Sequence, residues 1–99
     1  MIPKTVKICG IPYEVEICSD DWELDEINFG QIKFKECKIL INVEACEAMQ
    51  EQTLVHEIVH GMLMQLGYQE YSLDEKFVQA LAMAINQTFD VRVACDGKD

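Results

Sequence analysis

The sequence is poor in basic residues. Its 99 residues include 8 lysines and arginines against 18 aspartates and glutamates, which gives a formal charge of −10. Nucleic acids and anionic membranes attract proteins through positive patches, so we expect neither as a partner. No apolar run is long enough to span a bilayer, and the first residues lack a stretch of signal-peptide type. These absences predict a cytoplasmic protein.

Closely spaced cysteine pairs are also absent. The 5 cysteines are an odd number, are widely spaced and form no CxxC pair. In a reducing compartment the simplest interpretation is a set of thiols, several of them in strands or in the core. A structural zinc knuckle and a disulfide framework are both disfavoured.

The chain is long enough for one domain and too short for two. Its 49% content of hydrophobic residues supports one modest core. We expect the domain to span residues 1–99, with residues 90–99 as a loose tail because they show no periodicity. No internal repeat, low-complexity run or linker divides the sequence.

The first half of the sequence has the alternation of strands. Apolar and polar residues alternate over residues 5–9 and 13–18, and Gly10 and Pro12 mark a turn between them. Residues 31–43 have the pattern of a second hairpin. An acidic segment that contains Trp22 separates the two and is interpreted as a loop or a single helical turn. We predict a small antiparallel sheet of about three to four strands.

The second half has helical periodicity. Apolar residues recur at helical spacing from about Glu44 to Leu66, and Gly67 is a natural helix stop. The Ser-x-x-Glu pattern of residues 72–75 predicts a capping box that opens a second helix, which ends near Phe89. A short connection makes the two helices antiparallel neighbours. The predicted fold is α+β, a small sheet followed by two packed helices.

The strongest motif is the sequence HEIVH at residues 56–60, within the first predicted helix. Residues four apart on a helix lie on one face, so His56 and His60 can bind the same metal ion. Imidazole nitrogens suit zinc. Glu57 lies beside them, where it can take a proton from a metal-activated water and hand it to a leaving amine. The chain contains no other histidine.

A catalytic zinc site normally has three protein ligands, so a third ligand is needed. Without another histidine, an acidic residue at the start of the second helix is the best candidate. Glu75 and the alternative Asp74 both lie there. Glu75 also fits the reciprocal carboxylate of the capping box with Ser72, and spacing does not decide between the two roles.

Two stretches of the sequence resemble a known family: residues 53–61 (TLVHEIVHG) and residues 75–82 (EKFVQALA). They resemble the gluzincins, zinc peptidases with HExxH on one helix and a glutamate on the next, and the size resembles the minigluzincins. The pattern is also similar to small phage-borne relatives of the ImmA/IrrE-type metallopeptidases. In that family the ligand glutamate is followed by apolar or small residues three, six and seven positions later. Val78, Leu81 and Ala82 match, which implies Glu75 as the ligand.

The resemblance implies a mechanism in which an extended peptide pairs with the sheet edge above the metal helix. Larger relatives stabilise the oxyanion with a tyrosine or histidine from an extra subdomain, which this chain lacks. Tyr68 and Tyr71 are the nearest candidates, although both can simply pack over the helix ends. Gln79 can hydrogen-bond a ligand or remain a surface residue. Cys95 can reach the open metal position and inhibit the site.

Three functions are compatible with these patterns. The first is a zinc-dependent metallopeptidase that acts on a cytoplasmic peptide or protein, in a phage or its host. The second is a zinc-binding interaction module with little activity, favoured by the small size and the absence of a clear oxyanion group. The third is an interaction protein in which the motif arises by chance and its polar residues face solvent. The sequence does not define the oligomeric state.

Overall fold

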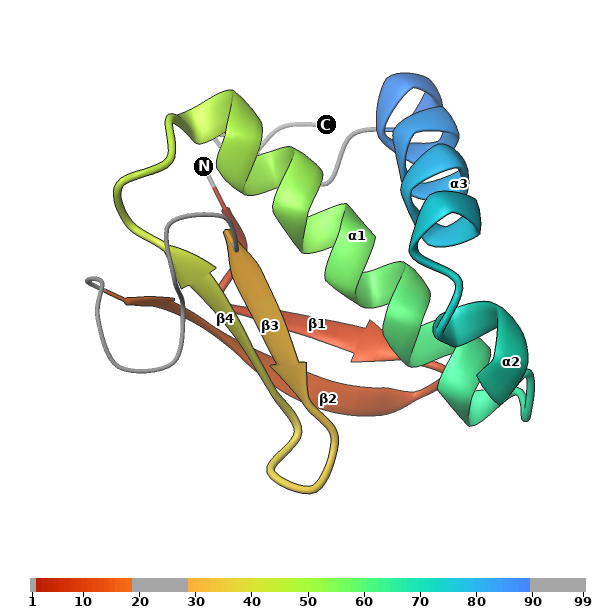
Figure 1. Cartoon of the computed structure of the whole chain (residues 1–99). Helices are drawn as coiled ribbons and strands as arrows, with labels where there is room; N and C mark the ends of the chain where they lie inside the picture. The colour runs from red at the N-terminus through yellow and green to blue at the C-terminus, as the bar shows by residue number, and fades with distance from the viewer. Residues whose placement is uncertain (1, 19–28, 90–99) are drawn as a thin grey trace.

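The computed structural model of the chain describes residues 2–18 and 29–89. Four strands form one sheet and three helices follow, so the α+β prediction is confirmed (Figure 1). The predicted tail, the segment around Trp22 and Cys95 lie outside the described residues. The elements are β1 (Thr5–Ile8), β2 (Ile11–Cys18), β3 (Gly30–Lys33), β4 (Lys38–Asn42), α1 (Glu47–Gln65), α2 (Gln69–Ser72) and α3 (Glu75–Thr88).

The sheet is mixed, and the prediction of an antiparallel sheet is wrong at its centre. The strand order is β1-β2-β4-β3. The β1–β2 and β3–β4 pairs are antiparallel hairpins, as predicted, but β2 and β4 are parallel. The second hairpin docks with β4 beside β2, which leaves β3 at the edge. Ile39, Leu40 and Ile41 of β4 are 0–1% exposed, as expected for a central strand.

The first hairpin closes through a two-residue turn at Cys9 and Gly10. Both residues have positive φ, 51° and 87°, as a turn compatible with the strand twist requires. Pro12 lies within β2 and not in the turn. The pairing of β2 with β4 begins only at Glu14, so the missing N–H of Pro12 costs no bond on that side.

Helix α1 lies between the sheet and α3 and packs against both. On the sheet side, a buried cluster joins α1 to three strands. On the other side, α1 and α3 share a smaller cluster of Val55, Val59, Val78 and Ala82. The sheet-side cluster consists of Ile8, Tyr13, Val15, Ile39, Ile41 and Leu54.

Gly61 brings α1 close to the sheet immediately after the HEIVH motif. A Cβ atom at this position would lie 2.8 Å from Ile8 Cδ1 and 3.1 Å from Ile32 Cδ1. A larger side chain at this position would therefore require the ends of the Ile8 and Ile32 side chains to move. The close approach holds His60 near the edge strand.

The end of α1 follows the sequence prediction. Gly67 has φ 87°. The amide of Tyr68 donates to Leu63 O at 2.8 Å, and that of Gly67 donates to Met64 O at 3.1 Å. These two bonds define a Schellman motif. The beginning of α1 at Glu47 is later than predicted, because Glu44 N donates to the Asn42 side chain in a preceding turn.

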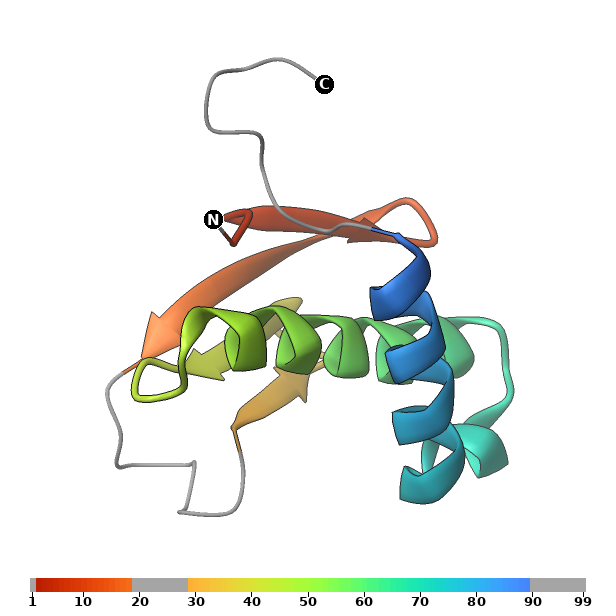
Figure 2. The same ribbon diagram turned by 90° about the horizontal axis from the view of Figure 1, so that it is seen from above.

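The capping-box prediction for α3 is wrong. The N-cap is Asp74, whose side chain accepts from Phe77 N at 3.1 Å. Ser72 is instead the last residue of α2, a short helix that the sequence does not predict. Because α2 turns the chain, α3 crosses α1 steeply and the expected antiparallel alignment is not observed (Figure 2). Glu75 is the first residue of α3 and is free of any capping role.

No helix among the residues 2–18 and 29–89 is both long and apolar enough to cross a membrane.

Candidate metal centre

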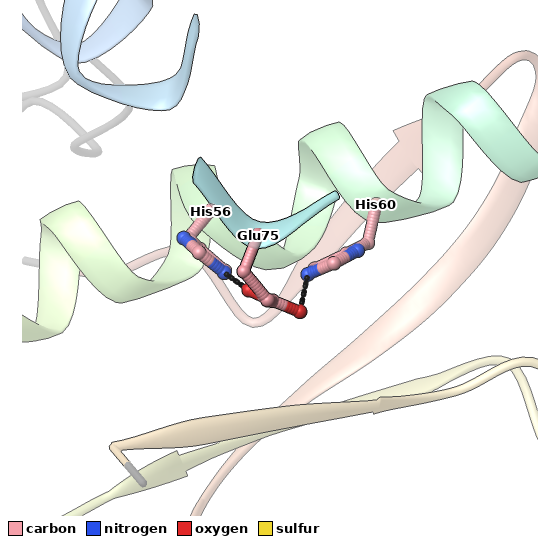
Figure 3. A group of neighbouring side chains, drawn as sticks. All are labelled: His56, His60 and Glu75. Atoms are coloured by element: carbon pink, nitrogen blue, oxygen red, sulfur yellow. Dashed lines mark hydrogen bonds and ion pairs between the residues drawn. The ribbon is translucent and has the colours of Figure 1, made fainter. Parts of the chain in front are cut away.

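The three predicted ligands meet in the structure. His56 and His60 lie one turn apart on α1, and Glu75 reaches between them from the start of α3 (Figure 3). Glu75 Oε1 lies 3.1 Å from His56 Nε2, and Glu75 Oε2 lies 3.2 Å from His60 Nε2. One ligand atom from each residue falls within 4.8 Å of the others. Asp74, the alternative ligand, serves as the helix cap.

The exposure of the three side chains leaves the site open on one side. The imidazoles of His56 and His60 are 19% and 13% exposed, whereas the Glu75 side chain is 70% exposed. The rings are therefore held by the protein, and the carboxylate faces solvent. An ion can enter from the carboxylate side.

Both nitrogens of the His56 ring face acceptor oxygens. Its Nδ1 lies 2.7 Å from Gln79 Oε1, and its Nε2 lies 3.1 Å from Glu75 Oε1. A neutral imidazole has one donor and one acceptor, so it can satisfy only one of these oxygens. To satisfy both oxygens, the ring needs either a second proton or a cation between Nε2 and the carboxylate.

Both nitrogens of the His60 ring also face acceptor oxygens. Ser72 Oγ donates its proton to His60 O at 3.3 Å, so it acts as an acceptor towards His60 Nδ1 at 3.2 Å. The other nitrogen, Nε2, faces Glu75 Oε2. Two imidazole nitrogens and a carboxylate are a typical donor set for a divalent metal with an open position. The residues present therefore fit a metal ion.

Glu57 is buried beside this group. It is 7% exposed and belongs to the lining of both hollows that flank the ligands. Burial raises the pKa of Glu57 to about 7; the charge of His56 opposes this rise and Glu75 adds to it. A bound cation would favour the ionised carboxylate. Without a bound cation, Glu57 is therefore a group that exchanges protons near neutral pH.

Two hollows border β3 and the ligands. The first, of about 350 Å³, includes Phe29, Met49 and Thr53, and we call it the Phe29 hollow. The second, of about 410 Å³, is the Phe34 hollow. Both share Gly30, His56, Glu57 and Glu75. The Phe34 hollow also includes the apolar side chains of Ile32, Phe34, Met64 and Leu73.

Gly30 is required where β3 passes the ligands. A Cβ atom at this position would overlap Thr53 Cγ2 of α1 and would lie 3.0 Å from Leu40 O. The absence of a side chain lets the edge strand run close to Glu57. Gly30 lines both hollows.

The two predicted oxyanion candidates do not line either hollow. Tyr68 and Tyr71 are half-exposed, and their ring centroids are 6.0 Å apart. Tyr71 also contacts Phe77, with ring centroids 5.3 Å apart. The structure therefore places both tyrosines in an aromatic cluster with the first turn of α3. A role in stabilising the oxyanion stays a prediction for them.

The hydrogen-bond partners of the imidazoles were predicted only in part. Gln79 lies four residues after Glu75 on α3, so helical spacing alone places both on one face. In the structure its Oε1 contacts the His56 ring, and the residue is exposed. Ser72 was assigned to a helix cap, and no sequence signal marks it as a partner of His60, because its position depends on α2.

Comparisons of the chain with known protein families, with curated proteins and with solved structures find no match. The resemblance to the gluzincins therefore rests on the quoted residues alone. No relative assigns a function to the chain, and the geometry of the site has to carry the inference.

Proposed function

We propose that this chain is a zinc-dependent metallopeptidase. The observation that carries the proposal is the convergence of His56 Nε2, His60 Nε2 and the Glu75 carboxylate beside the buried Glu57. This combination supplies three ligands, an open side and a proton carrier in one place. If the motif arose by chance, we would not expect Glu75, which belongs to a separate helix, to lie beside both imidazoles.

Each residue of the site would have a separate role in peptide hydrolysis. His56, His60 and Glu75 would hold zinc, which supplies a Lewis acid that activates water and polarises a carbonyl. Glu57 accepts a proton from the attacking water, whose oxygen bonds to the carbonyl carbon of the peptide. Glu57 then gives that proton to the amide nitrogen as the C–N bond breaks. A bound cation would favour the ionised form of Glu57 that the first transfer requires, and burial favours the protonated form that the second transfer requires.

The edge of β3 supports an extended peptide as the substrate. Asn42 N donates to Phe29 O at 2.8 Å, which makes these residues a hydrogen-bonded pair of the β3–β4 ladder. Since such pairs alternate along antiparallel strands, Gly30 and Ile32 turn their backbone N–H and C=O groups outward. Those groups lie along the two hollows, where an added strand can pair with them.

We propose the cytoplasm as the site of action. Cys9, Cys37 and Cys46 form no disulfide, which agrees with a reducing compartment. The formal charge of −10 disfavours nucleic acid and anionic membranes as partners and leaves a peptide or protein as the proposed partner.

The second candidate is a zinc-binding module that holds a partner without cutting it. The placement of Tyr68 and Tyr71 outside both hollows favours it, because oxyanion stabilisation is a large part of peptide hydrolysis. In this case the metal would mainly stabilise a small domain.

Metal analysis and peptide cleavage test the proposal together. Protein without a histidine tag is loaded with zinc, dialysed and compared with the Glu75→Ala and Glu57→Gln variants. We expect about one zinc per chain in the parent and in Glu57→Gln, and a marked loss in Glu75→Ala. Glu14→Gln on β2, outside both hollows, is the matched control.

Cleavage of a peptide library by the parent, abolished in Glu57→Gln, would establish the metallopeptidase. Zinc binding without cleavage by the parent would favour the module. A parent that retains no zinc would contradict both candidates.

A further inference from the structure

We infer that Gln79 and Ser72 are positioning residues that hold His56 and His60 as tautomers with the proton on Nδ1. Both Nε2 lone pairs then point towards Glu75, where the ion binds. The inference rests on the metal-binding part of the proposed function and does not require catalysis. It assigns a role to two residues that touch the ligands from opposite ends of the site.

Gln79 orients the His56 ring from α3. Its Oε1 lies 2.7 Å from Nδ1, a short distance for a nitrogen donor and a neutral oxygen. Gln79 and Glu75 lie one turn apart, so one face of α3 contacts both nitrogens of the same ring. The ring is therefore fixed in orientation as well as in tautomer.

Ser72 orients the His60 ring from α2. It is 3% exposed, and its hydroxyl bridges two atoms of one residue, His60 O at 3.3 Å and Nδ1 at 3.2 Å. A hydroxyl has a single proton, and that of Ser72 is donated to His60 O. The hydroxyl oxygen is left as an acceptor for Nδ1–H. This geometry selects the tautomer of His60.

The tautomer matters because a metal binds the unprotonated nitrogen. A histidine that carried its proton on Nε2 would have to move it before binding the ion. Acceptors at Nδ1 remove that step and raise the basicity of Nε2, which is why partners of ligand histidines affect metal affinity by roughly 10–100-fold. Through Ser72, α2 thus contributes a hydroxyl that holds His60.

A competing role for Gln79 is contact with a bound peptide, since it also lines the Phe29 hollow. A peptide contact would change cleavage and leave zinc affinity unchanged. The two roles therefore separate when zinc alone is the probe.

The test measures zinc affinity by competition with a chromophoric chelator, on protein without a histidine tag. Gln79→Leu removes the acceptor at an exposed position, where the fold is not at risk. Gln79→Glu keeps an acceptor oxygen and is the rescue variant. Ser72→Ala removes the hydroxyl, and its melting curve checks that it folds. Gln87→Leu, at an exposed position further along α3, is the matched control.

We expect Gln79→Leu and Ser72→Ala each to weaken zinc binding by roughly 10–100-fold. Gln79→Glu should bind at least as tightly as the parent, and Gln87→Leu should match it. Nitrogen-15 correlation spectra of the zinc-loaded parent should show protonated Nδ1 and metal-bound Nε2 in both rings. Loss of the Nδ1–H signal of His56 alone in Gln79→Leu would tie that residue to that ring.

Unchanged zinc affinity in Gln79→Leu would overturn the inference for Gln79, whatever happens to Ser72→Ala. Metal bound through Nδ1 in either ring would overturn the assigned tautomers. In both cases a parent that still binds about one zinc and loses it in Glu75→Ala would leave the proposed metal site standing. A parent that binds no zinc would overturn the site and the inference together.

Discussion

The two packed faces of α1 differ in the size of their buried clusters and in their distance from the candidate site. The face towards the sheet belongs to a cluster of six buried residues, five from three strands and Leu54 from α1; Tyr13 and three isoleucines are among them. The face towards α3 shares a cluster of four small residues, Val55, Val59, Val78 and Ala82. The site lies at the edge of this smaller interface. We therefore expect the sheet side to supply most of the stability, and the α3 side to depend partly on the His56, His60 and Glu75 group that could hold an ion.

The largest effect is expected from the sheet-side core. Leu54 is 0% exposed and packs against the sheet, so Leu54→Ala should cost about 2–5 kcal/mol of unfolding free energy. Val78→Ala on α3 removes less volume from the smaller cluster and should cost about 1–2 kcal/mol. Urea denaturation measures both. Equal losses would contradict the proposed difference between the two faces.

Removal of the metal should act mainly on the α3 side. At a free zinc concentration of about 1,000 times Kd, binding adds about 4 kcal/mol to the stability of the folded state. Chelation should therefore increase hydrogen exchange in α3 more than in β4 or the sheet-facing part of α1. A uniform increase over the whole chain would show that the metal stabilises both faces alike.

The metal-free protein should be stabilised by Glu57→Gln at alkaline pH. The pKa of Glu57 is about 7 in the folded state, above its ordinary value of 4.5, because the carboxyl is buried. The folded state thus binds this proton more tightly than the unfolded state, and stability falls as pH rises from 4.5 to about 7. Glutamine removes that loss.

In the presence of a chelator, Glu57→Gln should exceed the parent by up to about 3 kcal/mol at pH 8. The difference should disappear below the ordinary pKa of a glutamate. Urea denaturation at both pH values measures it. A variant less stable than the parent at pH 8 would mean that the Glu57 carboxylate is stabilised in the folded protein.

The smallest effect is expected at Tyr71. Its ring packs on Phe77 and Tyr68, and it does not line either hollow. Tyr71→Phe keeps those contacts and should leave peptide cleavage within about twofold of the parent. A fall in kcat of about 100-fold or more would instead identify the hydroxyl as an oxyanion donor.

The parts of the fold that follow from local sequence were predictable. The two hairpins are set by alternation and by turns, and the end of α1 is set by the positive φ of Gly67. The parallel pairing of β2 with β4 was not, because it joins two hairpins that are independent in sequence. Turn chemistry fixes the partner within a hairpin and carries no information about which hairpin edge docks beside another.

The candidate site shows the same limit. Helical spacing is sufficient to place His56 and His60 together, and to place Gln79 one turn from Glu75. Spacing did not choose between a ligand and a capping role for Glu75; the structure gives the cap to Asp74. Ser72 was misassigned because α2 is a single turn without a periodic pattern of its own. Its neighbour in space, His60, is determined by how that turn folds against α1.

The position of Glu75 at the first residue of α3 has a further consequence for the chain as a polymer. An ion held by His60 and Glu75 would cross-link two points that are near in sequence, closing a short loop in the same way as a disulfide. The conformational entropy that such a closure removes from the unfolded chain corresponds to about 3 kcal/mol. The cross-link would be reversible and would depend on the local concentration of metal. Loss of the ion would then loosen α3, which would be held to α1 by the small cluster alone, and would separate the three ligands in one event.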